Sequence, residues 1–294
     1  MNESSNDRAN IREFLTSRRS RITPGQVGLP EGSRRRVPGL RREEVAVLAG
    51  VSPEWYTRLE KGNIAGVSVE VLQAVATALQ LSEEERTYLL ELAQSARGTY
   101  RRSTRKKSQE QPAEHRQWLL DSMTGSAALI RNGRLDMLAS NHLSRALLRP
   151  MFDSDTSKAH GYVNFARFHF LDPAAKEFFA DWEGGAHATA ALLRVEASRE
   201  PHDAALRELI GELSTVSREF GELWAKHDIR FIHEGLKNLN HPEVGPLELY
   251  YQTLSTPTQR GSEMQLTTYT ARPGSADADK LALLSSLAGN HIQA

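Results

Sequence analysis

The chain has 294 residues, of which 39% are hydrophobic and 25% are charged, a composition typical of a globular protein with enough apolar material for a core. It contains no cysteine, which excludes disulfides, thiolate zinc sites, iron–sulfur clusters and cysteine nucleophiles. No apolar run approaches the ~20 residues of a membrane helix, and the polar start MNESSNDRAN is unlike a signal peptide. We therefore expect a cytoplasmic protein of about two domains, without a membrane partner.

The net charge of zero conceals an uneven distribution. Residues 1–107 hold 19 basic and 13 acidic side chains, a balance of +6, and residues 108–294 hold the other 18 and 24, a balance of −6. The excess is concentrated in two basic clusters, at residues 34–42 and 97–107. Such asymmetry indicates a nucleic-acid or membrane partner for the basic half, although basic runs also occur as solvated faces or linkers.

The N-terminal third of the chain reads as helices. Residues 1–9 are polar and are expected to be disordered, and apolar spacing then predicts a helix over about 8–20. Repeated proline and glycine between residues 24 and 39 predict a long loop. Residues 41–93 are rich in helix formers with clear stops, and the polar, basic stretch 98–112 reads as a linker.

A second domain of mixed type is expected to start near Ala113. Apolar runs at residues 127–130 and 135–139 flank Asn132-Gly133, which is a strong signal for a two-residue hairpin. A short helix is expected over residues 141–148.

The rest of this domain contains segments with helical patterns followed by segments with strand patterns. Asp172-Pro173 reads as a helix start, and residues 173–227 read as several helices. Residues 231–271 are β-rich, and residues 281–287 close as a helix. The order predicts an α+β domain with a small antiparallel sheet and a helical layer.

Residues 41–62 contain the most specific pattern. Val45, Ala46 and Ala49 form the inner stripe of a short helix, and Gly50 suits the left-handed conformation that ends it. A second helix follows, with Ser52 as N-cap, Pro53 at its first position, Tyr56 and Leu59 facing inward, and Lys61-Gly62 at its end. This arrangement is typical of a helix-turn-helix whose second helix can enter a DNA major groove.

The stretch EEVAVLAGVS…WYTRLEKG resembles the Cro/phage-repressor (XRE-type) helix-turn-helix over about residues 8–93. VPGLRREEVAVLAGVS with YTRLEKG is similar to the MmyB-like branch of actinobacterial regulators, as are LDMLASN, FLDPAAKEFFADWE, HPEVGPLELYYQTL and TYTARPGS in the second domain. Two departures stand out: Ser140 occupies a position that is often aromatic, and the loop 150–163 is irregular.

The resemblance implies an α+β protein of three parts. Residues 1–97 are expected to form an all-α, five-helix helix-turn-helix DNA-binding domain, and residues 98–112 a basic linker. Residues 113–294 are expected to form a PAS-like ligand-binding domain.

Alignment to the motif yields candidate DNA contacts. Ser52 and Arg42 lie at helix N-termini, where phosphates bind. Arg58 is the best candidate for base readout, because a guanidinium pairs bidentately with guanine. Trp55 either touches a thymine methyl or sugar, or covers the flank of the helix. The other candidates are Glu54 and Thr57 toward base edges, with Lys61, Arg34, Arg35 and Arg36 toward phosphates or solvated. Glu60 is expected to cap or pair internally.

The resemblance further implies that the second domain holds an apolar small molecule, for which the family suggests a fatty acid. The aromatic residues expected to line it, or else to form an ordinary core, are Phe165, Phe168, Phe178, Phe179, Trp182, Phe220 and Trp224. Asn141, Arg145 and His241 are candidate polar anchors for a carboxylate. No catalytic or metal-binding motif is evident, so we expect no catalytic residues, no metal and no other cofactor.

The sequence thus predicts a DNA-binding transcriptional regulator that senses a small apolar ligand and modulates operator binding. One alternative is a constitutive regulator whose second domain dimerises or recruits a partner, and another is an enzyme with a tethered helix-turn-helix. Because one helix-turn-helix reads only ~4–5 bases, we expect a homodimer on double-stranded DNA. We expect this complex in the cytoplasm, at the nucleoid.

Overall fold

A computed structural model of the chain describes residues 3–30, 39–64, 66–96, 114–200, 203–226, 234–257 and 263–290. The chain divides by its contacts into two compact units: residues 1–102 with 194–207 and 224–231, and the remaining residues. The expected linker at 98–112 and the arginines at 34, 35 and 36 lie outside the described residues.

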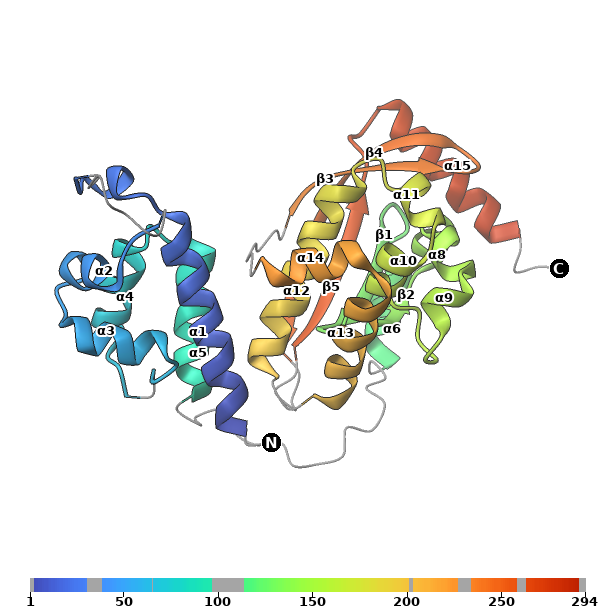
Figure 1. The fold of residues 1–294 in the computed structure, drawn as a ribbon. Helices are drawn as coiled ribbons and strands as arrows, with labels where there is room; N and C mark the ends of the chain where they lie inside the picture. The colour runs from blue at the N-terminus through green and yellow to red at the C-terminus, as the bar shows by residue number, and fades with distance from the viewer. Residues whose placement is uncertain are drawn as a thin grey trace. The chain divides into compact units, whose positions relative to one another are not determined.

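The N-terminal part of the first unit is entirely helical, as expected (Figure 1). Its elements are α1 (Glu3–Arg21), the 3₁₀ turn η1 (Pro24–Val27), α2 (Arg42–Leu48), α3 (Pro53–Glu60), α4 (Val69–Ala78) and α5 (Glu83–Ala96). The expectation that residues 1–9 are disordered is wrong from Glu3 onward. Early residues of α1 are in contact with the domain, because a Cβ on Gly62 would lie 2.5 Å from the Cα of Arg8.

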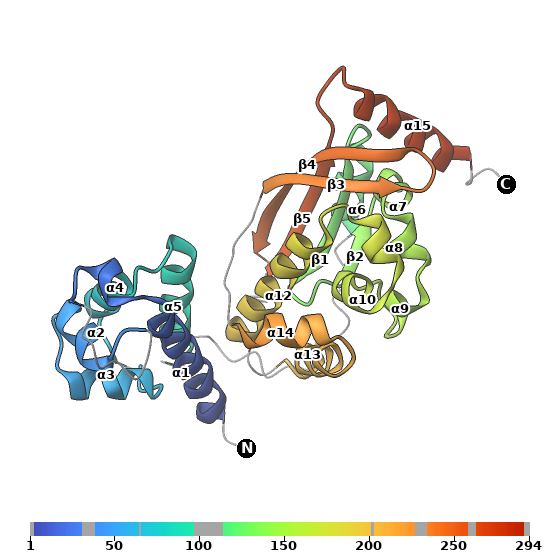
Figure 2. The same ribbon diagram turned by 45° about the horizontal axis from the view of Figure 1, so that its top comes forward.

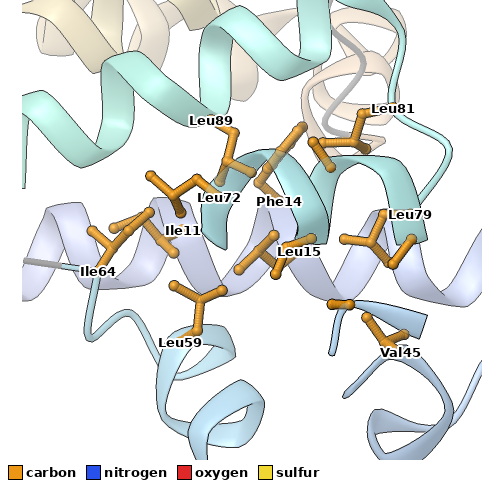
Figure 3. Packing of buried hydrophobic residues seen from close by; sticks show 14 of the residues in the cluster. Ile11, Phe14, Leu15, Val45, Leu59, Ile64, Leu72, Leu79, Leu81 and Leu89 are labelled. Carbon is orange, nitrogen blue, oxygen red and sulfur yellow. The ribbon is translucent and has the colours of Figure 1, made fainter. Parts of the chain in front are cut away.

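One apolar core joins these helices (Figure 3). Ile11, Phe14 and Leu15 project from α1 into the cluster. The ring of Phe14 meets Tyr88 of α5 edge-on, with 5.0 Å between centroids, and burial raises the pKa of Tyr88 to about 12. The other members labelled in Figure 3 are Val45, Leu59, Ile64, Leu72, Leu79, Leu81 and Leu89. The core fixes α2 and α3 against α1, which leaves the opposite face of α3 outward.

The second unit contains a five-stranded antiparallel sheet, which confirms the α+β fold. Its strands are β1 (Ala127–Asn132), β2 (Met137–Ser140), β3 (Glu234–His241), β4 (Gly245–Pro257) and β5 (Glu263–Thr270), in the order β2-β1-β5-β4-β3. Within the described part of the chain, no helix is long and apolar enough to cross a membrane.

The expected hairpin between β1 and β2 is present, but its turn is longer than the two residues predicted. The backbone N–H of Asn132 donates to the carbonyl of Asp136, and Leu135 adopts a left-handed φ of 68°. The Asn132 side chain donates to the Asp136 carboxylate at 2.9 Å, so this asparagine belongs to the strand pairing rather than to the turn. The result is a three-residue loop of the kind that ends in a left-handed residue.

Helices fill the chain between β2 and β3 and follow β5. They are α6 (Glu114–Ser122) before the sheet, then α7 (His142–Leu147), α8 (Arg149–Asp153), α9 (Asp155–Lys158), α10 (Phe165–Leu171), α11 (Ala174–Phe178), α12 (Trp182–Arg199), α13 (Ala204–Val216), α14 (Arg218–Ala225) and α15 (Ala276–Asn290). The Asp172 carboxylate accepts from the backbone N–H of Ala174 at 2.9 Å, and α11 starts directly after Pro173, which takes the N-cap position predicted for Asp172. The closing helix is longer than the predicted 281–287.

The strand register gives the sheet two faces. The outer face carries Ala128, Ile130 and Leu266, which pack with Leu120 of α6. The opposite face, here called the inner face, is defined by Leu129, Arg131, Gln265, Thr267, Tyr269, Tyr251, Thr253, Leu249, Lys237 and Leu239. Figures 1 and 2 show α10 and α12 beside the strands, and Phe179, directly after α11, bridges to Leu239 of the inner face.

Candidate functional site

The helix-turn-helix forms as its sequence dictates. Gly50 ends α2 with a left-handed φ of 66°, and the backbone N–H of Val51 returns to the carbonyl of Ala46. Ser52 caps α3, its hydroxyl accepting from the backbone N–H of Trp55 at 3.1 Å, and Pro53 occupies the first turn. Tyr56 and Leu59 are 0% and 1% exposed, so the inner face of α3 is as predicted.

The outer face of α3 carries the candidate base-reading residues. Glu54 and Arg58 are exposed, and Thr57 is half-buried. Trp55 is half-buried and packs against the apolar core, which favours the interpretation that it covers the flank of the helix. Lys61 is exposed directly after α3. The structure therefore brings Ser52, Glu54, Arg58 and Lys61 onto one short solvent-facing element.

Glu60 pairs internally, as expected. Its side chain is 1% exposed and accepts from Arg19 Nε at 2.7 Å and from the Thr16 hydroxyl at 3.2 Å. Arg42 Nε donates to the other carboxylate oxygen, while about half of the Arg42 side chain stays exposed. Arg42 thus has a structural partner at the start of α2 in addition to its proposed contact with a phosphate.

The aromatic candidates of the second domain gather into an interlocked cluster. Phe179 lies between Phe165 and Phe168, at 5.7 and 5.9 Å between ring centroids, and 5.0 Å from Phe178. Phe220 joins through Phe170, at 5.0 Å. The aromatic residues that sequence reasoning grouped by proximity are therefore neighbours in space as well. Trp224 carries the Arg194 guanidinium over its ring at 4.1 Å.

His169 connects this cluster to Trp182. The two rings stack at 5.3 Å, His169 Nε2 lies 3.0 Å from the carbonyl oxygen of Trp182, and Trp182 Nε1 donates to the carbonyl of His169. Burial, with the nearby charge of Lys237, lowers the pKa of His169 to about 3, so the ring is neutral at physiological pH. Its Nδ1 has no hydrogen-bond partner among the described residues.

The polar anchors expected from sequence all make hydrogen bonds within the fold. The Asn141 amide donates to the carbonyls of Leu120, Met123 and Ser126, and its oxygen accepts from the backbone N–H groups of Ala128 and Ser144. His241 is likewise held between the Ala146 carbonyl and the backbone N–H of Glu243. Arg145 donates from Nε to the Ser140 hydroxyl at 3.1 Å. Asn141 and His241 join segments of the domain.

Two cations that the sequence analysis did not single out lie on the inner face of the sheet. Arg131 of β1 donates from Nε to Gln265 of β5 at 3.1 Å. The Lys237 ammonium of β3 lies 4.4 Å from the ring centroid of Phe179. In the sequence, each cation lies two residues from a leucine of the same strand, so the two-residue period of a strand puts both on one face. Which face that is becomes clear only once the strand register is known.

These features define a class: a DNA-binding protein with a helix-turn-helix head and a separate α+β domain. Comparison with protein-family models agrees, because residues 9–89 match a helix-turn-helix domain and residues 113–284 match the MmyB-like transcription regulator ligand binding domain. The second match covers more than half of the chain, which therefore belongs to the MmyB-like transcription regulators. No curated protein matches the sequence. The chain combines the two parts of a ligand-responsive transcription regulator.

Proposed function

We propose that this chain is a sequence-specific transcriptional regulator whose C-terminal domain binds an apolar acid of the fatty-acid class and thereby modulates operator binding. The observation that carries the proposal is the pairing of an intact helix-turn-helix with a ligand-binding domain. The order of the antiparallel sheet, with helices inserted between β2 and β3, supports a PAS-like description of that domain. We assign no enzymatic role and place the protein in the cytoplasm, at the nucleoid.

In the proposed complex, α3 enters the major groove. Arg58 pairs with a guanine, and Glu54 and Thr57 contact neighbouring base edges. The exposed N-cap Ser52 and the exposed Lys61 contact phosphates, which fix the register but carry no sequence information. Phosphate contacts are also proposed for Arg42 and for the arginines at 34, 35 and 36.

The proposed functional unit is a homodimer on two half-sites about one DNA turn apart. The apolar side chains of α5, such as Leu89 and Leu92, are buried in the core of the first unit. In contrast, Leu236, Tyr250 and Leu254 are exposed on the outer face of β3 and β4. This difference supports dimerisation through the second domain.

Native mass spectrometry of the purified chain, followed by denaturation and extraction, tests the ligand part of the proposal. We expect a dimer that carries an apolar acid, whose mass names the ligand. The ligand can change operator affinity only if it binds one arrangement of the dimer more tightly than the other. A dimer without any small molecule, whose operator affinity is indifferent to added apolar acids, would instead favour a constitutive regulator.

A further inference from the structure

Helix α12 contributes residues to both compact units of the chain. Its residues up to Leu193 belong to the second unit, whereas Arg194 to Arg199 belong to the first unit, together with the helix-turn-helix head. The helix has 18 residues and therefore spans about 27 Å. Because its backbone is hydrogen-bonded along its length, it moves largely as one piece, and a displacement of its start is carried to its end.

The first turn of α12 is fastened to the aromatic cluster of the second unit. Trp182, its first residue, stacks on His169 with 5.3 Å between ring centroids, and the indole Nε1 donates to the His169 carbonyl at 2.9 Å. Gly185 faces the same ring, because a Cβ at this position would lie 2.7 Å from His169 Cε1. Since Cβ atoms do not approach other atoms so closely, the start of α12 can lie this near to α10 only with glycine there.

The last two turns of α12 are packed into the core of the first unit. Val195 is 3% exposed and belongs to the same apolar cluster as Leu89 and Leu92 of α5. Arg199 forms a bidentate ion pair with Glu91 of α5: Nη2 lies 2.7 Å from Oε1, and Nε lies 3.3 Å from each carboxylate oxygen. The two side chains are 26% and 17% exposed, so this pair is less screened by solvent than a surface pair.

The C-terminal end of α14 also contacts the first unit. The carbonyl of Lys226, directly after α14, accepts from Arg21 Nη2 at 2.5 Å and from the Ser17 hydroxyl at 3.4 Å, and both donors belong to α1. Arg194 of α12 places its guanidinium 4.1 Å from the ring centroid of Trp224 of α14. The ends of α12 and α14 are therefore joined to each other and held on α1 and α5.

We propose that Val195 and Arg199, here called the latch, release the DNA-reading head when α12 is displaced at its other end. A molecule that enters the aromatic cluster beside His169 pushes the first turn of α12 outward, and the helix then withdraws Val195 and Arg199 from α5. The ligand favours the released arrangement because it gains its contacts only after α12 has moved. This inference rests on the proposed ligand-sensing function, and it adds the element that transmits the signal.

The latch can be tested without DNA or ligand, because Gly185→Ala pushes α12 away from His169 as the ligand would. Hydrogen exchange of the full chain, measured by mass spectrometry, reports on the protection of α5. Peptides of α5 should exchange at least about fivefold faster in Gly185→Ala and in Arg199→Gln, because α5 loses the contacts that protect it. The control Gly211→Ala, in α13, adds its Cβ in open space, and Arg218→Gln removes an exposed ion pair within α14, so both should leave α5 unchanged.

Two further variants separate the latch from general damage to the fold. Trp182→Leu, which removes the stacking on His169, is a second way to loosen the start of α12, and it should also speed exchange in α5. The exchanged pair Glu91→Arg with Arg199→Glu should restore the slow exchange that either single change abolishes. Circular dichroism checks that each variant is folded.

Operator affinity tests the consequence for DNA binding. On a duplex selected with the wild-type chain, Gly185→Ala should change the Kd at least about fivefold, and it should change nothing in the Arg199→Gln background. Unchanged exchange of α5 in folded Gly185→Ala and Trp182→Leu, or equal effects of Gly185→Ala on the Kd in both backgrounds, would overturn the latch and leave the proposed function standing. A wild-type chain that selects no duplex would contradict the proposed function, and the exchange experiment would still decide on the latch.

Discussion

The two units of the chain treat buried charge in opposite ways. In the first unit, the buried Glu60 is neutralised by Arg19 and Arg42. In the second, Arg131 and Lys237 face inward, and the described residues provide no acid to pair with them. Removing one partner of a buried ion pair destabilises a fold because an uncompensated charge is left inside, whereas a buried charge without a partner already carries that cost. The comparison therefore separates a paired buried charge from two inward-facing charges that the described residues do not pair.

The largest effect is expected at the paired charge. Glu60→Ala leaves Arg19 and Arg42 without their shared carboxylate and should cost about 3–5 kcal/mol of stability. Urea denaturation followed by circular dichroism measures this loss in the first unit. The exposed Glu54→Ala, at the other end of the same helix, should cost less than about 1 kcal/mol. Equal losses in the two variants would contradict the assignment of Glu60 as the centre of the network.

The next effect concerns an exposed charge of the first unit. Arg58→Ala should cost about 1–3 kcal/mol of binding to an operator selected from random duplexes, and it should relax the sequence preference, because a bidentate contact to guanine is lost. Lys61→Ala is the matched comparison: it should weaken binding uniformly across sequences and lower the salt slope by about 1. Both affinities can be measured by fluorescence anisotropy. A uniform loss for Arg58→Ala would show that it touches only phosphate.

The helix-turn-helix could be predicted from sequence because its signals are local. Gly50 takes the left-handed conformation that ends α2. Ser52 and Pro53 start α3, and the cap bond of Ser52 reaches only three residues along the chain, to the backbone N–H of Trp55. The matching element in the second domain, the hairpin at Asn132, was predicted to exist but not in its true form. Its turn depends on the bond between Asn132 and Asp136, which competes with the two-residue turn.

The two inward-facing cations could not be predicted, because their placement on one face depends on the strand register. Arg131 and Lys237 belong to strands that are distant in sequence and share a face only after β5 and β4 have paired between them. The bonding of Asn141 could not be predicted either: its amide donates to backbone carbonyls of α6 and of the turn that follows α6. The composition of a segment shows that a polar group is present, but only the assembled sheet shows whether that group is already bonded.

The smallest expected effect has the opposite sign from the loss at Glu60. In lipid-free protein at pH 7, Lys237→Met should raise stability by about 1–2 kcal/mol, because it removes a desolvated cation without an ion-pair partner among the described residues.

The folded-state pKa of about 8 lies below the ordinary 10.5, so the unfolded chain binds more protons between these values. The stability of the wild type should therefore rise relative to the variant across that window, and the advantage of the variant should shrink from pH 7 to pH 10. Urea denaturation at both pH values measures this, with the exposed Lys158→Met as the control. A wild type more stable than Lys237→Met at pH 7 would mean that the ammonium already has a favourable partner inside the domain, and the contrast with Glu60 would disappear.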